Sequence, residues 1–262
     1  VDERVQIIRT ASRVADGRCK VIAGIGGPAT MTAVANARAA REAGADALLV
    51  FPTPAYLNDP LDVRIPYLYH KAIAESSDLP IIAFQLGPVF GGINFTADAL
   101  IKLLELPQII GLKDASFDAQ RFLLTRDIVY QADHPVTMIT GNDNFLLESF
   151  LMGAKGGLLG YAAVGVGLLV ELLKAVQNKA FDRAVSMQER VQGFSDYIYG
   201  KPIGDYRARC KVALVSMGLF TPELTFVRPP FLSLWEQEKD FAYQAVHKAG
   251  LLAEQIDIDI IL

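Results

Sequence analysis

Lys113 is the residue of this sequence whose position most clearly suggests chemistry. It closes the apolar run 108–112 and is followed at once by Asp114. In a β-strand, side chains alternate between two faces, so Ile109, Gly111 and Lys113 share one face, and Gly111 leaves space beneath the lysine. An amine held in apolar surroundings is partly deprotonated, and only a neutral amine attacks a carbonyl carbon. The sequence therefore predicts a nucleophilic lysine, with a solvent-exposed lysine at a strand end as the alternative.

Loops rich in glycine or proline follow other apolar runs, at residues 51–56, 84–92 and 140–143. If the runs are strands of a barrel, these loops lie on its catalytic face. The loop 84–92 contains Gly87, Gly91 and Gly92 and has no charged side chain. It can shape a pocket and offer backbone N–H groups, but it cannot supply an acid or a base. Ordinary turn formation is the alternative for all of these loops.

Short apolar runs alternate with amphipathic stretches through the first 160 residues. The runs predict strands at 20–24, 47–51, 80–84, 109–113, 136–140 and 157–160. The stretches between them predict helices at 1–15, 30–43, 59–75, 97–105, 117–131 and 144–152. Thr96 suits a helix start, while Gly44 and Gly153 follow helix ends, where a left-handed residue is favoured. The strands are almost entirely apolar, as in a parallel sheet covered on both sides.

After residue 160 the pattern changes to helices only, predicted at 166–177, 180–199, 205–217 and 236–252. We therefore expect the α/β class, a (β/α)8 TIM barrel with additional C-terminal helices. Residues 1–165 would form the barrel, and residues 166–262 its last helix and a helical extension. Only six strands are predicted where a closed barrel has eight, so the barrel is expected to be incomplete at its N-terminus.

Composition excludes several classes of function. The chain has 262 residues, of which 52% are hydrophobic and 21% charged, so we expect a large core rather than disorder. A net charge of −4 argues against nucleic acid as the partner. The longest weakly polar stretch, 158–173, is too short to cross a bilayer comfortably. Cys19 and Cys210 match no disulfide or metal spacing; we expect both to be buried thiols in a reducing compartment, hence a cytoplasmic location.

One glycine-rich turn formally fits a nucleotide-binding motif. Gly24, Gly26 and Ala29 follow a predicted strand and precede a helix, as in G-x-G-x-x-A. A dinucleotide-binding fold has an acidic residue at the end of the next strand, where this chain has Phe51 and Pro52. We therefore interpret the turn as a tight barrel-mouth turn, and keep an NAD-dependent oxidoreductase only as a minor alternative.

Several motifs, in order along nearly the whole chain, carry a resemblance to a known family. They are Gly24-Ile25-Gly26-Gly27, Gly44-Ala45-Asp46-Ala47, Gly111-Leu112-Lys113-Asp114-Ala115-Ser116, Gly141-Asn142-Asp143, Gly153-Ala154-Lys155-Gly156 and Val227-Arg228-Pro229-Pro230. The chain resembles the dihydrodipicolinate synthase / N-acetylneuraminate lyase family. The resemblance implies a (β/α)8 barrel, a tetramer or dimer, and a Schiff base between Lys113 and a 2-oxo acid. It also implies that the first strand, first helix and second strand are missing from the given sequence.

The chain departs from this family's pattern at positions that matter for activity. Phe84 stands where the family has its proton-shuttling tyrosine. The arginine that grips the substrate carboxylate has no counterpart in residues 86–92. Of the aromatic pair in the loop after the preceding strand, Tyr56 is kept and Leu57 is not. Loss of a general acid or base typically removes ~10²–10⁴-fold of rate.

We therefore expect a carbon–carbon or carbon–oxygen lyase, an aldolase or dehydratase, that acts on a small 2-oxo acid through Lys113. Tyr56 or a water would move protons, and Phe84 would lie beside the lysine. The expected substrate-binding residues are Gly87, Gly91, Gly92, Gly141 and Leu159, with the first three offering N–H groups to the carboxylate. No metal, cofactor, nucleic acid or membrane partner is expected, and a homo-oligomer is. The alternative is a barrel that has lost catalysis and binds a small acid as a sensor or scaffold.

Overall fold

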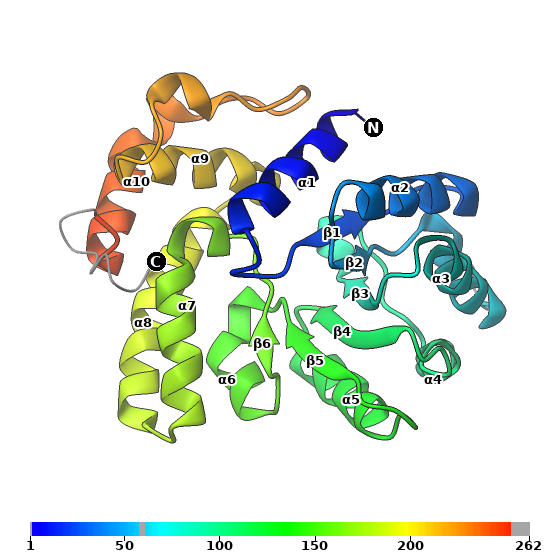
Figure 1. The fold of residues 1–262 in the computed structure, drawn as a ribbon. Coiled ribbons are helices and arrows are strands. Elements are labelled where there is room, and N and C mark those ends of the chain that lie inside the picture. Colours follow the sequence, from blue (N-terminus) through cyan, green and yellow to red (C-terminus); the bar gives the residue numbers. More distant parts are fainter. Residues whose placement is uncertain (1, 58–60, 253–262) are drawn as a thin grey trace. The chain divides into compact units, whose positions relative to one another are not determined.

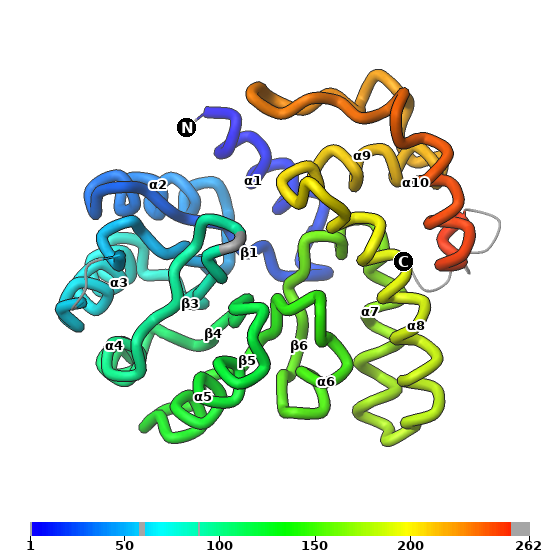
Figure 2. The backbone as a smooth tube through the Cα atoms, turned by 180° about the vertical axis from the view of Figure 1, so that it is seen from behind, coloured from blue at the N-terminus to red at the C-terminus, as the bar shows by residue number. Residues whose placement is uncertain are grey.

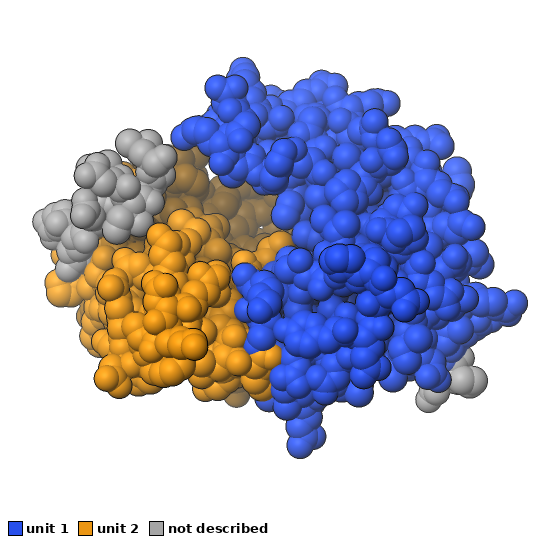
Figure 3. Space-filling model, turned by 60° about the horizontal axis from the view of Figure 1, so that its bottom comes forward, with its two compact units in different colours: residues 1–140, 153–155 blue, residues 141–152, 156–262 orange. Residues whose placement is uncertain are grey.

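A computed structural model describes residues 2–57 and 61–252 of the chain. It divides into two compact units (Figure 3). Unit 1 comprises residues 1–140 and 153–155, and unit 2 comprises residues 141–152 and 156–262. The predicted division into a barrel up to residue 165 and a helical extension after it stays a prediction.

Unit 1 is an alternation of parallel strands and helices. The strands are β1 (Ile22–Ile25), β2 (Ala47–Val50), β3 (Ile81–Leu86), β4 (Ile109–Ala115) and β5 (Thr137–Thr140), paired side by side in chain order. The helices are α1 (Asp2–Ala15), α2 (Thr30–Glu42), α3 (Arg64–Ser77), α4 (Ala97–Leu103) and α5 (Ala119–Tyr130). Helices α2 to α5 follow one another around the outside of the sheet (Figures 1 and 2). This arrangement confirms the predicted α/β class.

Local sequence explains where these elements begin and end. The Thr96 hydroxyl accepts a hydrogen bond from the Ala99 N–H at 3.2 Å, which confirms Thr96 as the cap of α4. Asp118 caps α5 in the same way, accepting from two backbone N–H groups. Gly44 and Gly153 adopt φ of 95° and 114°, the left-handed region expected after helix ends. Helix α3 begins at Arg64 rather than near residue 59, and residues 58–60 lie outside the described part.

The register of β3 on β4 decides which side chains share a face. Phe84 pairs with Lys113, and Gln85 with Asp114. The register shifts between Ile81, which pairs with Ile109, and Ile82, which pairs with Gly111. Because of this irregularity one face change is skipped, so Ile109 lies on the face opposite Lys113 and that part of the prediction is wrong. Gly111 does share the face of Lys113, and its neighbour there is the Ile82 side chain.

Unit 2 is mainly helical. Its elements are η3 (Asp143–Phe145), α6 (Leu146–Leu151), β6 (Gly156–Gly157), α7 (Ala162–Gln177), α8 (Phe181–Ile198), η4 (Ile203–Asp205), α9 (Tyr206–Ser216), η5 (Pro222–Thr225) and α10 (Trp235–Ala249). The buried Arg209 ties three of these segments together. It donates to the carbonyls of Gly200 and Pro202 before α9, and to the Glu238 carboxylate of α10 at 3.1 Å.

Two further predictions can be compared with this fold, the number of strands and the burial of the cysteines. The described residues contain six strands, so the eight-stranded barrel is not complete in them. Cys210 is buried as expected, but Cys19 is exposed, because it lies in the turn between α1 and β1 rather than in the core. None of the described helices is both long and apolar enough to span a membrane. In the same part of the chain, no three His, Cys, Asp or Glu side chains gather to hold a metal.

Candidate active site around Lys113

Lys113 lies two residues before the end of β4, and its side chain is 9% exposed. Its amine sits over the ring of Phe84, with 4.1 Å between Nζ and the ring centroid. The sequence alternative, a strand-end lysine in solvent, is therefore wrong. Burial disfavours the charged ammonium, whereas the negative face of an aromatic ring favours it. The two effects therefore act in opposite directions on the charged form of this amine.

A row of side chains across neighbouring strands fixes the position of the Phe84 ring. Phe84 is 2% exposed and meets Phe51, which directly follows β2, edge to face at 4.8 Å. Phe51 in turn lies against Gly24 and Gly26 of the glycine-rich turn, where an added Cβ would be 3.3–3.4 Å from it. These glycines make room for an aromatic side chain. That packing supports the interpretation as a tight turn at the sheet edge over the nucleotide-binding alternative.

On the other face of the same two strands, Asp114 is fully buried and accepts several hydrogen bonds. Ser116 donates to it through its backbone N–H at 3.1 Å and its hydroxyl at 2.8 Å. The Gln85 side-chain amide donates to the other carboxylate oxygen. Rotating or removing this buried carboxylate would leave its donors without an acceptor, which costs free energy. It therefore fixes the end of β4 and the chain around Lys113.

Gln85 links this carboxylate to the surrounding elements. Its amide nitrogen also donates to the Thr125 hydroxyl of α5 at 2.8 Å. Its amide oxygen accepts from the Phe95 N–H at 3.2 Å, just before α4. We call Gln85, Asp114, Ser116 and Thr125 the anchor cluster. The cluster joins β3, β4, α5 and the chain before α4 through hydrogen bonds alone.

The loop after β3 uses its glycines for its own geometry. The Gly87 N–H donates to the Ala115 carbonyl at 2.8 Å, and a Cβ there would lie 2.8 Å from the Ser116 carbonyl oxygen. The Gly91 N–H donates to the Pro88 carbonyl at 2.8 Å, with φ of 69°. The Gly92 N–H reaches the Gly87 carbonyl only at 3.4 Å, and a side chain at Gly92 would collide with Leu86. Of the three expected carboxylate donors, Gly92 thus has the weakest competing bond.

The loops after β3 and β4 also meet through two aromatic rings. Phe90 and Phe117 lie with their ring centroids 4.8 Å apart. Phe117 adopts φ of 59°, a conformation that is rare for a bulky residue without a glycine's freedom. Such strain persists only where surrounding contacts hold it, and it often occurs beside functional sites.

Tyr56 lies in η1 (Pro54–Leu57), buried against Tyr69 and Phe95. Its hydroxyl is 3.4 Å from His70 Nδ1, and that nitrogen is 2.8 Å from the Pro66 carbonyl. Because a carbonyl only accepts, Nδ1 carries the proton. Burial raises the pKa of Tyr56 far above its usual value and lowers the pKa of His70 to about 4. Both are therefore neutral near pH 7, and the role of Tyr56 in proton transfer stays a prediction.

One polar residue near this loop was not singled out by sequence reasoning. Thr53 is buried, and its hydroxyl has no hydrogen-bond partner among the described residues. It follows β2 by three residues, at the same edge of the sheet as Lys113. A buried hydroxyl without a partner is costly, so it is a candidate for contact with a bound ligand. No spacing or motif in the sequence distinguishes it from an ordinary turn threonine.

The two remaining expected substrate-binding residues, Gly141 and Leu159, belong to unit 2, where both are buried. Their role stays a prediction. The anchor cluster was also missed, although its signal was present: Asp114 and Gln85 are polar residues inside otherwise apolar strands. Such residues are either functional or hydrogen-bonded, and here they are hydrogen-bonded.

Comparison with known proteins extends these observations. The 4-hydroxy-tetrahydrodipicolinate synthase of Thioalkalivibrio sulfidiphilus is 31% identical over 252 residues, which cover 95% of this chain and 81% of that protein. The enzyme of the same name from an Azoarcus species is 31% identical over 256 residues, covering 97% and 82%.

Solved structures give the same picture. The dihydrodipicolinate synthase of Acinetobacter baumannii, in complex with pyruvate, matches with a TM-score of 0.81 and 28% identity, over 96% of this chain and 82% of that chain. YagE from E. coli, also in complex with pyruvate, shares the fold, with a TM-score of 0.84 and 24% identity over 95% and 82%. The sequence pattern of the dihydrodipicolinate synthetase family matches residues 1–249. The chain therefore belongs to the dihydrodipicolinate synthetase family.

Proposed function

We propose that this protein cleaves or forms a bond next to the carbonyl of a 2-oxo acid, pyruvate or a longer one, through a Schiff base on Lys113. Membership of the family makes the chain a lyase-type enzyme. The observation that carries the proposal is the buried amine at the end of β4, fixed over an aromatic ring. The pyruvate complex of the Acinetobacter relative supports the substrate class.

The chemistry follows from an amine in these surroundings. The neutral Lys113 amine attacks the C2 carbonyl carbon, the carbonyl oxygen leaves as water, and a protonated imine remains. This cation accepts the electron pair of a bond that breaks at the neighbouring carbon, which gives an enamine. In aldol cleavage that bond is C–C. In dehydration it is C–H, and the enamine then expels hydroxide from the next carbon, which leaves with its electron pair and becomes water. Proton transfer then regenerates the imine, and water releases the product and the lysine.

Phe84 has no ionisable group, so we assign it an electrostatic role in place of proton transfer. Its ring face lies 4.1 Å from the amine nitrogen, and the imine nitrogen takes the place of that nitrogen. The attraction between a cation and a ring contributes about 1–2 kcal/mol where water is largely excluded. The ring therefore favours the charged imine over the neutral carbinolamine that precedes it.

We propose that the carboxylate of the substrate is bound by the loop after β3, with Gly92 as the principal donor, and by Thr53. Gly87 and Gly91 serve mainly to shape this loop, because their N–H groups already have close acceptors. We further propose that the sheet belongs to a (β/α)8 barrel in a cytoplasmic homo-oligomer. Family membership supports this, as does the parallel, chain-order sheet.

Borohydride trapping tests the proposal. The protein is incubated with pyruvate, 2-oxobutyrate and longer 2-oxo acids, then reduced, and its intact mass is compared with that of the Lys113→Ala variant. We expect a reduced adduct with at least one 2-oxo acid in the wild type and none in the variant. Absence of any adduct with every 2-oxo acid would overturn the proposal.

A second function is favoured by one feature of the sequence: Phe84, which has no ionisable group, stands where the resemblance to the family implies a tyrosine. A chain without that acid–base group could bind a small acid as a sensor or scaffold without turnover. Ligand-dependent thermal stabilisation that is unchanged in Lys113→Ala, with no product formed, would support this alternative. Loss of stabilisation in that variant would support the enzyme.

A further inference from the structure

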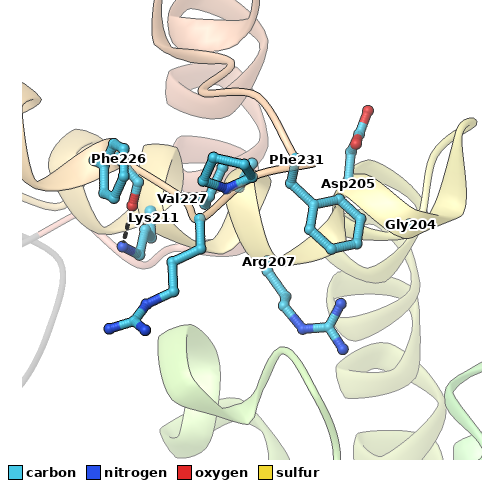
Figure 4. Close-up of a pocket in the computed structure, with 10 residues that line it drawn as sticks. Gly204, Asp205, Arg207, Lys211, Phe226, Val227 and Phe231 are labelled. Carbon is cyan, nitrogen blue, oxygen red and sulfur yellow. Dashed lines mark hydrogen bonds between the residues drawn. The ribbon is translucent and has the colours of Figure 1, made fainter. Parts of the chain in front are cut away.

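Unit 2 contains a cavity of about 550 Å³ that none of the proposed chemistry uses. It lies between the first half of α9 and the segment that follows η5 (Figure 4). Its size falls within the range of small-molecule sites, which are mostly apolar with a few polar groups. The lining agrees with this description: Ala208, Val227 and Pro229 with the rings of Phe226 and Phe231 are apolar.

The polar part of this cavity is mainly positive. Arg207, Lys211 and Arg228 line it, against one carboxylate, Asp205. Figure 4 shows the Asp205 and Arg207 side chains extending in opposite directions, so the acid does not neutralise the arginine. Lys211 donates to the Phe226 carbonyl, and no ion pair of Arg207 or Lys211 occurs within the described residues.

Aromatic rings position the Arg207 guanidinium at this cavity. Its Cζ lies 4.6 Å from the Tyr206 ring centroid and 5.7 Å from that of Phe231. A guanidinium that contacts only ring faces keeps its N–H groups in the plane available. These groups form a flat fork that matches a carboxylate. Phe231 is 41% exposed, which leaves part of its ring open to a second ligand contact.

We propose that this cavity binds a small organic anion that combines a carboxylate with a compact apolar body. The carboxylate would pair with Arg207, and the apolar body would cover Phe231 and Val227. The site lies within unit 2 and uses no residue of the Lys113 site, so it is a second site rather than part of the first. It stands or falls independently of the Schiff-base proposal.

Fluorine NMR with 4-fluorobenzoate tests this proposal directly. The wild-type protein is first treated with pyruvate and borohydride, so that Lys113 is blocked wherever it reacts. We expect concentration-dependent broadening of the probe signal that is unchanged by this treatment. In the variant Arg207→Gln we expect the Kd to rise at least ~10-fold. Arg207 is exposed, so the substitution is compatible with folding, and circular dichroism with Tm checks this.

Matched controls separate a built site from general charge. Arg183→Gln removes an exposed arginine of the same unit and should change the Kd by less than ~2-fold. Phe231→Leu should raise the Kd ~3-fold, and 4-fluorobenzyl alcohol, the neutral analogue of the probe, should bind ~10-fold more weakly. Equal binding by Arg207→Gln would overturn the proposal. Displacement of the probe by an equal concentration of inorganic phosphate would also overturn it. Phosphate has no apolar body, so such displacement would mean that the apolar lining contributes nothing to binding.

Discussion

Lys113 and Asp114 are neighbours in the chain, yet they lie on opposite faces of the sheet. The two buried side chains have different surroundings there. Asp114 accepts from Gln85 and twice from Ser116, within a cluster of hydrogen bonds that joins four segments. Lys113 instead has the ring of Phe84 beneath its amine. On one face, hydrogen bonds hold the Asp114 carboxylate in place. On the other face, the Lys113 amine lies over an apolar ring.

The difference shows how one strand can serve both stability and reactivity. A hydrogen-bonded carboxylate costs several kcal/mol to disturb, so it fixes the backbone. A lysine amine over the face of an aromatic ring is stabilised by the electrostatics of the ring, and in its neutral form the nitrogen can attack a carbonyl carbon. The loop after β2 presents a third situation. Thr53 Oγ1 in this loop and His70 Nε2 of the following helix α3 are buried without a partner in the described part of the chain.

The largest expected effect is a difference in the free energy of unfolding between variants on the two faces of β4. Asp114→Ala leaves the Gln85 amide and the Ser116 N–H without their acceptor, so we expect the free energy of unfolding to fall by about 3 kcal/mol. Lys113→Ala removes one buried amine and its ring contact, so we expect a change of about 1 kcal/mol or less. Urea denaturation of the three proteins measures this. Equal losses in both variants would remove the distinction between the faces.

The next effect concerns pH and His70. Burial lowers its pKa from 6.5 to about 4, so between these values the unfolded chain binds a proton that the folded chain does not. Stability is therefore unaffected by this group above pH 6.5 and falls as the pH decreases towards 4. At pH 5 the loss is about 2 kcal/mol. Unfolding of His70→Phe, which lacks the group, should show a smaller loss between pH 7 and pH 5 than the wild type; parallel curves would contradict the pKa.

A smaller effect tests the ring beneath Lys113. Phe84→Leu removes the aromatic face but keeps an apolar side chain, so the charged imine loses about 1 kcal/mol and the apparent Kd for pyruvate rises ~5-fold. Phe84→Tyr keeps the ring and should retain the affinity within ~2-fold. Calorimetric titration with pyruvate distinguishes them. An unchanged Kd in Phe84→Leu would mean that the ring only fills space.

The smallest expected effect concerns Thr53. Thr53→Val replaces a buried hydroxyl that has no partner by a methyl group of similar size, so the protein should become more stable by about 1 kcal/mol. If the hydroxyl binds the substrate carboxylate, KM for the 2-oxo acid should rise at the same time. A gain in stability with an unchanged KM would remove Thr53 from the proposed site.

Much of unit 1 could be predicted from the sequence, because its strands are apolar runs and its helices carry recognisable ends. Thr96, Gly44 and Gly153 act as predicted. The irregular pairing near Ile109 could not be predicted, since nothing in an apolar run of isoleucines indicates where the register shifts. Helix α3 was predicted to start at residue 59 and starts at Arg64, whose backbone N–H donates to the Asp62 carboxylate.

The candidate site was predictable only in part. Lys113 stood out because it ends an apolar strand and is followed by another polar residue. The contact with Phe84 depends on which residues are paired across β3 and β4, and a single strand does not contain that register. The competing bonds of Gly87 and Gly91 likewise depend on the approach of two loops distant in sequence. Motifs identify residues, whereas the availability of their hydrogen-bonding groups is a property of the fold.

The most direct test of the central claim locates the covalent bond. The wild-type protein is incubated with pyruvate, reduced with borohydride and digested, and the peptides are identified by mass spectrometry. The control is Lys102→Ala, which removes a half-buried lysine of the same unit that pairs with Glu105. We predict that the reduced adduct occurs on the peptide containing Lys113, that Lys102→Ala retains it and that Lys113→Ala lacks it. An adduct on any other lysine, or an equal yield from Lys113→Ala, would contradict the assignment of Lys113 as the nucleophile.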